Sequence, residues 1–255
     1  MVIVKTKDEI EGIRRSSRIV AEVLEVLREF VRPGLTTWAL NRKAEEVIRK
    51  RRGRPAFKGY KPSFNSEAYP AAICASVNEE VVHGLPSKRR VLREGDIVSV
   101  DVGVVLNGFF GDGAATFAVG EISDNARRLM EVTEQALYRG IEQAVPGNRV
   151  GDISCAVQKW VESHNYSVVR EYVGHGVGKQ IHEDPPIPNF GNCSEGPRLV
   201  EGMTIAIEPM VAEGRGEVSV RPDGWTAYTK DGSLAAHFEH TIAITENGPE
   251  ILTVV

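Results

Sequence analysis

The sequence predicts an α+β protein made of two similar halves. Helical and strand patterns follow one another in the same order twice along the chain, and turn motifs recur at a nearly constant spacing. Each half also places a carboxylate at the same point of an apolar strand. We expect one domain over 1–255, with halves of approximately 1–122 and 123–255 about a pseudo-twofold axis. The repeated motifs are Pro33-Gly34 with Pro146-Gly147, 113 positions apart, and Glu94-Gly95 before Asp101 with Glu201-Gly202 before Glu208, 107 positions apart.

Two amphipathic helices open the first half. Thr6 and Glu9 form a capping-box pattern, and apolar residues then recur at helical spacing, which predicts a helix over roughly 7–31. A second helix is expected from Thr36 or Thr37 to the basic run 49–52, since positive charge suits the carboxyl end of a helix. The stretch 54–69 is rich in glycine, proline and aromatic residues, and we expect an irregular loop there.

Short β-favouring runs follow, broken by turn residues. Asn107-Gly108 between two of them predicts a tight hairpin. Ser123 begins a third helical pattern and Pro146-Gly147 ends it. We expect strands at 72–77, 97–102 and 113–119, helices at about 124–144 and 150–164, and mainly strands from 168 onward.

Composition and charge exclude several classes of protein. The chain has 31 Lys and Arg against 35 Asp and Glu, a net charge of -4, so no overall footprint for specific nucleic-acid binding or an anionic membrane is present. The basic runs 49–52 and 88–90 remain candidate docking patches, although solvated surface is the more common reason for such runs.

Cysteine usage and the amino terminus bear on the compartment. The three cysteines form no C-x-x-C pair and leave an odd count, which argues against a disulfide framework and a thiolate zinc site and favours a reducing compartment. The first residues are too charged for a signal peptide, and no apolar stretch of membrane-spanning length occurs. We therefore expect a cytoplasmic protein.

Two of the apolar strands carry carboxylates that need a positive partner. Asp101 follows Ile-Val-Ser-Val and Glu208 follows Ile-Ala-Ile, and burying a carboxylate is costly unless it is paired or binds a metal. In the hairpin closed by Asn107-Gly108, Asp112 opposes Gly103, so Asp101 and Asp112 are diagonal neighbours roughly 7 Å apart on one face. That separation suits two metal ions about 3.5–4 Å apart.

His175 and Glu239 complete the candidate ligands. Glycines on both sides of His175 leave room for a close backbone approach. Four carboxylates and one imidazole favour Mn, Fe or Co, with Zn also acceptable. Taken singly, each residue has a structural explanation: a turn or salt-bridge carboxylate, a loop histidine or a surface glutamate. Their conjunction on the strands of a repeated unit favours a metal centre.

These residues lie in motifs that resemble a known family, the type I methionine aminopeptidases with the pita-bread fold. The matching stretches cover most of the chain. The resemblance implies a central curved antiparallel sheet with helices outside, about a pseudo-twofold axis. The stretches are 74–86 with His83, 94–101 with Asp101, Gly111-Asp112, 174–178 with His175, His182-Glu183, Glu208-Pro209 and Glu239-His240-Thr241.

The resemblance also implies a role for each site residue. Asp101 would chelate one of two divalent ions (Co, Mn, Fe or Zn), Asp112 and Glu239 would bridge both, and His175 and Glu208 would bind the other. Glu208 would also accept the proton of the attacking water. The substrate is the N-terminal methionine of a nascent polypeptide with a small second residue, and its free α-amino group would bind metal. His83 and His182 would flank the peptide as catalytic groups.

The methionine pocket implied by the family consists mainly of aromatic residues, which favour a thioether. The sequence departs from the family pattern at three places. Residues 61–68 are an insertion, Ile181 stands where an aromatic residue is often found, and Gly103 stands where some members carry threonine. The implied pocket residues are Phe57, Tyr60, Tyr69, Cys74 and Trp225, together with His83 and His182.

Two alternatives remain open. One is a proline-directed peptidase of the same fold, which normally carries a further amino-terminal domain, and the other is a binding module that has lost its metals. The 31 residues between Glu208 and Glu239 leave no room for the helical insertion of the type II enzymes. We expect a monomer, with Lys88-Arg89-Arg90 as a candidate for transient ribosome contact.

Overall fold

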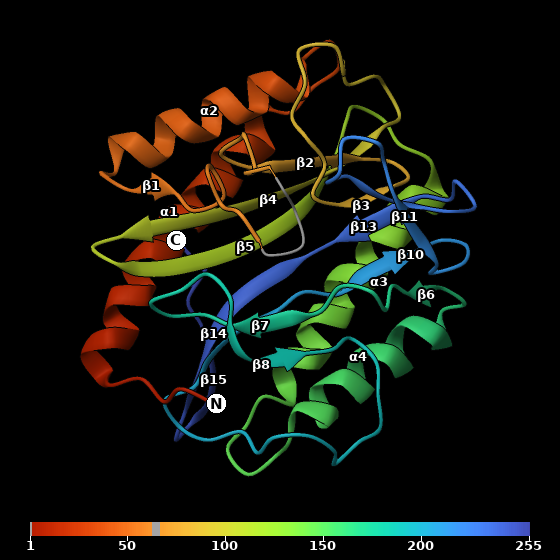
Figure 1. The fold of residues 1–255 in the computed structure, drawn as a ribbon. Coiled ribbons are helices and arrows are strands. Elements are labelled where there is room, and N and C mark those ends of the chain that lie inside the picture. The colour runs from red at the N-terminus through yellow and green to blue at the C-terminus, as the bar shows by residue number, and fades with distance from the viewer. Residues whose placement is uncertain (1, 63–66) are drawn as a thin grey trace.

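The computed structural model describes residues 2–62 and 67–255 and contains two helix pairs (Figure 1). Helix α1 (Lys7–Phe30) and helix α2 (Thr37–Lys50) belong to the first half, and α3 (Asp124–Glu142) and α4 (Val150–Ser163) to the second. The expected boundaries of all four helices are confirmed to within about two residues. The capping box of α1 is present, with Thr6 and Glu9 hydrogen-bonded to each other's backbone.

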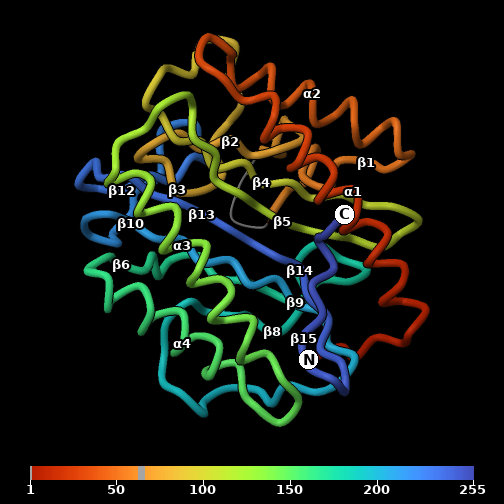
Figure 2. Tube along the Cα trace, turned by 180° about the vertical axis from the view of Figure 1, so that it is seen from behind, coloured from red at the N-terminus to blue at the C-terminus, as the bar shows by residue number. Residues whose placement is uncertain are grey.

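A curved antiparallel sheet forms the centre of the molecule. In the described residues its strands follow the order β1-β4-β5-β14-β9-β7-β8, with β2 paired to β4 and β15 to β14. Helices α1 and α3 cross behind these strands in Figure 1 and in front of them in Figure 2. The strands are β1 (Arg54–Pro55), β2 (Cys74–Val77), β4 (Ile97–Leu106), β5 (Phe109–Ala118), β7 (Gly174–Gly176), β8 (Glu183–Ile187), β9 (Thr204–Ile207), β14 (Glu239–Thr245) and β15 (Gly248–Ile251).

Two small sheets lie beside the central one. One has the order β13-β10-β6 and the other β11-β12-β3. They hold the segments that lead into and out of the central strands, including those around Glu208 and Glu239. Their strands are β3 (Glu80–Val82), β6 (Ser167–Val168), β10 (Met210–Ala212), β11 (Val218–Val220), β12 (Ala227–Thr229) and β13 (Ala235–His237).

The two halves repeat each other in backbone detail. Helices α2 and α4 have the same length and start 113 positions apart, and strands β4 and β9 start 107 positions apart. An isolated bridge joins Thr36 to Val91 in one half and Arg149 to Arg198 in the other, at those same two offsets. The turn glycines of each motif also agree, since Gly95 and Gly202 have φ values of 89° and 87°. The predicted internal repeat is therefore present in the fold.

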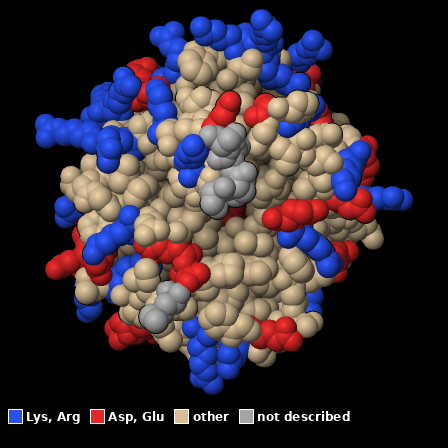
Figure 3. Space-filling view, viewed as in Figure 1, with Lys and Arg blue, Asp and Glu red and all other residues tan. Residues whose placement is uncertain are grey.

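The basic run at the end of α2 is engaged with neighbouring acids. Lys and Arg side chains gather along the upper edge in Figure 3, where Figure 1 places α2. Arg49 pairs with Glu45 at 2.6 Å and Arg51 with Glu22 at 2.6 Å. These ion pairs agree with the interpretation of a solvated helix end.

The expectation drawn from the cysteines was wrong for one pair. Cys155 on α4 and Cys193 form a disulfide across a separation of 38 residues, and Cys74 is a buried free thiol. An odd count excludes a fully paired set but not a single bond, and partners this far apart in sequence meet only in the folded chain. In the described part of the chain, no helix combines the length and apolar character needed to cross a membrane.

Candidate metal centre and substrate pocket

The five predicted ligands lie on strands that are consecutive across the central sheet. The order is β4, β5, β14, β9 and β7, and Glu208 directly follows the last residue of β9. Asp101 on β4 and Glu239 on β14 both pair with Ala114 of β5, so their side chains share one face of the sheet. Residues from both halves of the chain therefore converge on one point.

The predicted hairpin register is confirmed. Gly103 pairs with Asp112 and Asp101 with Ala114, which places the two aspartates as diagonal neighbours. Thr241 of β14 fixes the backbone of Asp112, because its Oγ1 accepts from Asp112 N at 3.1 Å and donates to Asp112 O at 2.7 Å. Asp112 is 3% exposed, so its carboxylate is withdrawn from solvent.

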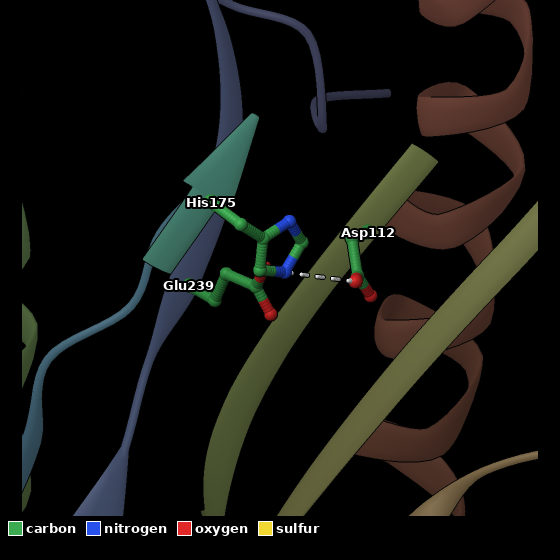
Figure 4. A group of neighbouring side chains, drawn as sticks. All are labelled: Asp112, His175 and Glu239. Atoms are coloured by element: carbon green, nitrogen blue, oxygen red, sulfur yellow. Dashed lines mark ion pairs between the residues drawn. The ribbon is translucent and has the colours of Figure 1, made fainter. Parts of the chain in front are cut away.

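Three of the side chains form a compact group (Figure 4). Asp112, His175 and Glu239 each offer one atom that lies within 4.8 Å of the others. His175 Nε2 is 3.8 Å from Asp112 Oδ2 and 3.4 Å from Glu208 Oε1. Glu208 thus borders this group, and Asp101 lies beside Asp112.

The histidine in this group is oriented as a ligand would be. His175 Nδ1 is 3.0 Å from the carbonyl oxygen of Gly176, an acceptor, so Nδ1 carries the proton. Burial lowers the pKa of His175 to about 3, with His182 contributing. The ring is then neutral, and the lone pair of Nε2 points at the carboxylate oxygens of Asp112 and Glu208. A cation between these atoms would turn repulsion into coordination.

The pKa values of the four carboxylates also indicate a cation site. Burial raises the pKa of Asp101 to about 7 and raises those of Asp112, Glu208 and Glu239 well above their ordinary values, with neighbouring carboxylates adding to the shift of the last three. Asp101 Oδ1 and Glu239 Oε1 are buried and have no hydrogen-bond partner in the part of the chain that the structure describes. Unpaired buried oxygens are costly, and an oxygen-rich set with one imidazole fits divalent ions.

The glycines flanking His175 serve the neighbouring strands. A Cβ atom on Gly174 would collide with the carbonyl of Ala206, and one on Gly176 with the carbonyl of Asp184. The close backbone approach expected from the sequence is therefore an approach of adjacent strands. It packs β7 tightly enough to aim the imidazole at the carboxylates.

A cavity of about 910 Å³ opens at this group. Every residue predicted for the site lines it, from both halves of the chain. The cavity has an acidic end at the candidate ligands and an aromatic end at the predicted methionine pocket. Its lining includes Asp101, Asp112, His175, Glu208, Glu239, His83, His182, Phe57, Tyr60, Tyr69, Cys74 and Trp225.

The aromatic end is a packed cluster of rings. Tyr69 makes edge contacts with Trp225 at 5.0 Å and with Phe57 at 6.5 Å between ring centroids. Asp223 Oδ1 accepts from Trp225 N at 2.8 Å, and this turn presents the indole to the cavity. Ile181 joins the same cluster and is 5% exposed. An aliphatic side chain thus stands at the position where the resemblance implied an aromatic residue.

The two tyrosines that flank the predicted insertion at 61–68 are joined through their backbones. Tyr69 N donates to Tyr60 O and Gly59 N donates to Tyr69 O, both at 2.8 Å. Residues 63–66 of the predicted insertion lie outside the described residues. The structure also explains why position 103 is a glycine, because a Cβ there would lie 2.6 Å from Phe57 Cε1.

His83 and His182, expected to flank the peptide, both line the cavity. His182 Nδ1 is 2.9 Å from the Tyr60 hydroxyl, and its ring is 4.4 Å from that of His175. His83 has a φ of 60°, an unusual left-handed backbone for a non-glycine residue, and packs edge-on to Tyr172. Burial lowers the pKa of both, that of His83 to about 4. Both imidazoles are therefore neutral near pH 7.

Sequence reasoning missed several residues of this region. Tyr172, Gln180 and Asp184 border the cavity. His237 is 1% exposed and its Nε2 lies 3.7 Å from Glu208 Oε2. No local signal marked His237, because strand β13 ends at His237 and β14 begins at Glu239, so the alternation of side chains along one strand does not connect the two residues.

Comparison with known proteins identifies the class. The chain belongs to metallopeptidase family M24, whose sequence profile matches residues 11–246. Within that family it groups with the methionine aminopeptidases. It is 54% identical to the methionine aminopeptidase of Clostridium acetobutylicum over 254 residues, covering 100% of this chain and 99% of the relative. It is 51% identical to methionine aminopeptidase 1 of Bacillus subtilis, with 100% of both covered.

Solved structures agree with this placement. A methionine aminopeptidase from Thermotoga maritima superposes with a TM-score of 0.96 at 51% identity, covering 100% of both chains. A prolidase from Pyrococcus furiosus superposes with a TM-score of 0.76 at 26% identity, and this chain covers 66% of it. The pita-bread fold expected from the motifs is confirmed, and the methionine aminopeptidase is much the nearer of these two neighbours.

Proposed function

We propose that this chain removes the N-terminal methionine from polypeptides whose second residue is small, using two divalent ions held by Asp101, Asp112, His175, Glu208 and Glu239. The observation that carries the proposal is the convergence of these five side chains, from five consecutive strands, beside an aromatic pocket. Ions held by these residues would supply Lewis acidity that lowers the pKa of the water molecule attacking the first peptide carbonyl. Co, Mn, Fe and Zn all suit this donor set.

The protein's own side chains do the remaining work. Glu208 accepts the proton of the attacking water and passes it to the leaving amine. If the Tyr60 hydroxyl donates to His182 Nδ1, then Nε2 carries the ring proton and can donate to the carbonyl oxygen as charge develops. His83 contacts the backbone of the second residue. The rings of Phe57, Tyr69 and Trp225 enclose the methionine side chain.

The test measures metal content and activity on the same samples. Metal-stripped protein is resupplied with Co, Mn, Fe or Zn and assayed on Met-Ala-Ser and on Xaa-Pro peptides. Glu208→Ala is compared with Glu131→Ala, an exposed carboxylate on α3. We expect metal-dependent release of methionine, lost only in Glu208→Ala, and two ions per chain by elemental analysis.

The other outcomes are equally informative. Release only before proline would move the activity to the proline-directed branch, which the similarity to a prolidase makes the main rival. No release with any metal, together with no bound ion, would favour a binding module. One ion per active chain would contradict the dinuclear site.

The oligomeric state, the compartment and a ribosome contact are further parts of the proposal. We infer a monomer in the cytoplasm that touches the ribosome through Lys88 and Arg89, which are exposed. Arg90 is half-buried and its charge acts on Glu80, so it contributes less to that surface. Unchanged ribosome cosedimentation after Lys88→Glu and Arg89→Glu would overturn the contact. The disulfide weighs against a reducing compartment, and thiol counting on freshly lysed cells decides the point.

A further inference from the structure

Among the described residues, a buried imidazole beside Glu208 has no hydrogen-bond partner for one of its nitrogens. His237 is 1% exposed, and its Nε2 is among the buried unpaired atoms of the structure. Leaving such an atom unpaired in the interior is costly. The residue does not border the cavity, so it acts on the cavity wall and not directly on a bound peptide.

The atom that His237 faces is one oxygen of Glu208. His237 Nε2 lies 3.7 Å from Glu208 Oε2, whereas His175 Nε2 lies 3.4 Å from the other oxygen, Oε1. The carboxylate is thus held between two imidazoles that face different oxygens. One oxygen is directed to the candidate metal group, and the second is directed to His237.

Hydrogen bonds and strand pairing fix the backbone of His237. Its N–H donates to Thr116 Oγ1 at 3.0 Å, and the same hydroxyl donates to His237 O at 2.9 Å. His237 also pairs with Met210 across β13 and β10, two residues beyond Glu208. The pairing of β10 with β13 therefore holds the segments that carry the carboxylate and the imidazole side by side.

We propose that His237 is a positioning residue for Glu208, donating a hydrogen bond from Nε2–H to Oε2. Closing the distance from 3.7 Å to about 3.0 Å needs only a small rotation of the glutamate side chain. The bond would fix which oxygen faces the candidate metal group and which is free to take a proton. Partners of this kind typically change activity or metal affinity by about 10- to 100-fold when they are removed. This inference rests on the proposed function, because it gives Glu208 a task in peptide hydrolysis.

Two amide variants of different reach test the bond. In His237→Gln the amide nitrogen takes roughly the place of Nε2. The side chain in His237→Asn is shorter by one methylene, so its amide nitrogen does not reach Glu208. Both keep a buried polar group, so their effects on folding are matched. We expect Asn to lower kcat on Met-Ala-Ser by about 10- to 100-fold with KM changed by less than about threefold. The Gln variant should stay within about threefold of the original kcat.

Calorimetric titration of the metal-free proteins with Mn²⁺ gives a readout independent of turnover. The Asn variant should bind more weakly by about 10-fold, and the Gln variant should not. Equal kcat values for the two variants, or equal losses that follow their melting temperatures, would overturn the positioning role. An inactive unsubstituted protein would instead refute the proposed function, so the two failures are distinguishable.

Discussion

Replacing Gly103 with alanine should harm the methionine pocket more than the metal group. The new Cβ would lie 2.6 Å from Phe57 Cε1 and 3.0 Å from both Phe57 Cζ and Ala56 Cβ. Carbon atoms rest about 3.5–4.0 Å apart, so the ring must retreat by roughly 1 Å. Phe57 is only 9% exposed and packs against Tyr69, which leaves the cavity as the direction of movement.

The clash should lower the free energy of unfolding and the melting temperature by amounts that can be estimated. Overpacking of a filled core typically destabilises by about 1–3 kcal/mol, and a chain of this length loses about 2–4 °C of melting temperature per kcal/mol. We expect Gly103→Ala to melt roughly 2–12 °C lower by scanning calorimetry. KM for Met-Ala-Ser should rise because the ring narrows the pocket, while kcat changes less.

A double-mutant cycle with Phe57→Ala isolates the contact. Removing the ring removes the obstacle, so Gly103→Ala should cost little in a Phe57→Ala background, with a coupling of about 0.5–3 kcal/mol. An unchanged melting temperature and KM in Gly103→Ala would refute the reasoning. So would an equal loss in both backgrounds, since the clash would then lie elsewhere.

Three further predictions concern stability. In the metal-free protein the folded pKa of Asp101, about 7, lies above its ordinary 3.8, so the stability this group contributes is lost as pH rises through 7. Burial also raises the pKa values of the other three carboxylates, which adds to the loss in the same direction; urea unfolding between about pH 4 and 7 should show a decline of about 1.4 kcal/mol per pH unit for each extra proton held by the fold, and a rise would contradict it. Cys155→Ser should cost about 2–4 kcal/mol, because the disulfide closes a long loop, and dithiothreitol should then have no added effect on denaturant unfolding. Tyr69→Phe removes a hydroxyl bonded to the carbonyls of Ile73 and Gly84 and should cost about 1–2 kcal/mol; kcat should fall too, since Gly84 adjoins His83, and an unchanged kcat would separate the two effects.

Much of the fold followed from local patterns. Capping residues, Pro-Gly stops and apolar spacing located all four helices, and Asn107-Gly108 alone set the register that brings Asp101 beside Asp112. The offsets of 113 and 107 reappear as matched bridges and matched turn glycines, because a duplicated unit keeps its backbone conformation while its side chains diverge.

What was missed depends on contacts between distant segments. Strand β1, Arg54–Pro55, exists only because β4 pairs with it, and its glycine- and proline-rich surroundings favour a loop. The Cys155–Cys193 pairing spans 38 residues and carries no local signal. In the sequence, His237 is an ordinary residue of a short strand, and only the fold places Glu208 beside it.

The strand order across the central sheet has a consequence for synthesis of the chain. In the described residues, strands β5 and β9, from different halves, do not pair with each other; β14, made after both of them, inserts between them and brings Glu239. A growing chain that has not yet produced β14 has two separated sets of carboxylates and no shared centre. Contacts of such long range also form slowly. An enzyme proposed to act on chains leaving the ribosome would thus complete its own centre only after its strand β14 has left the ribosome.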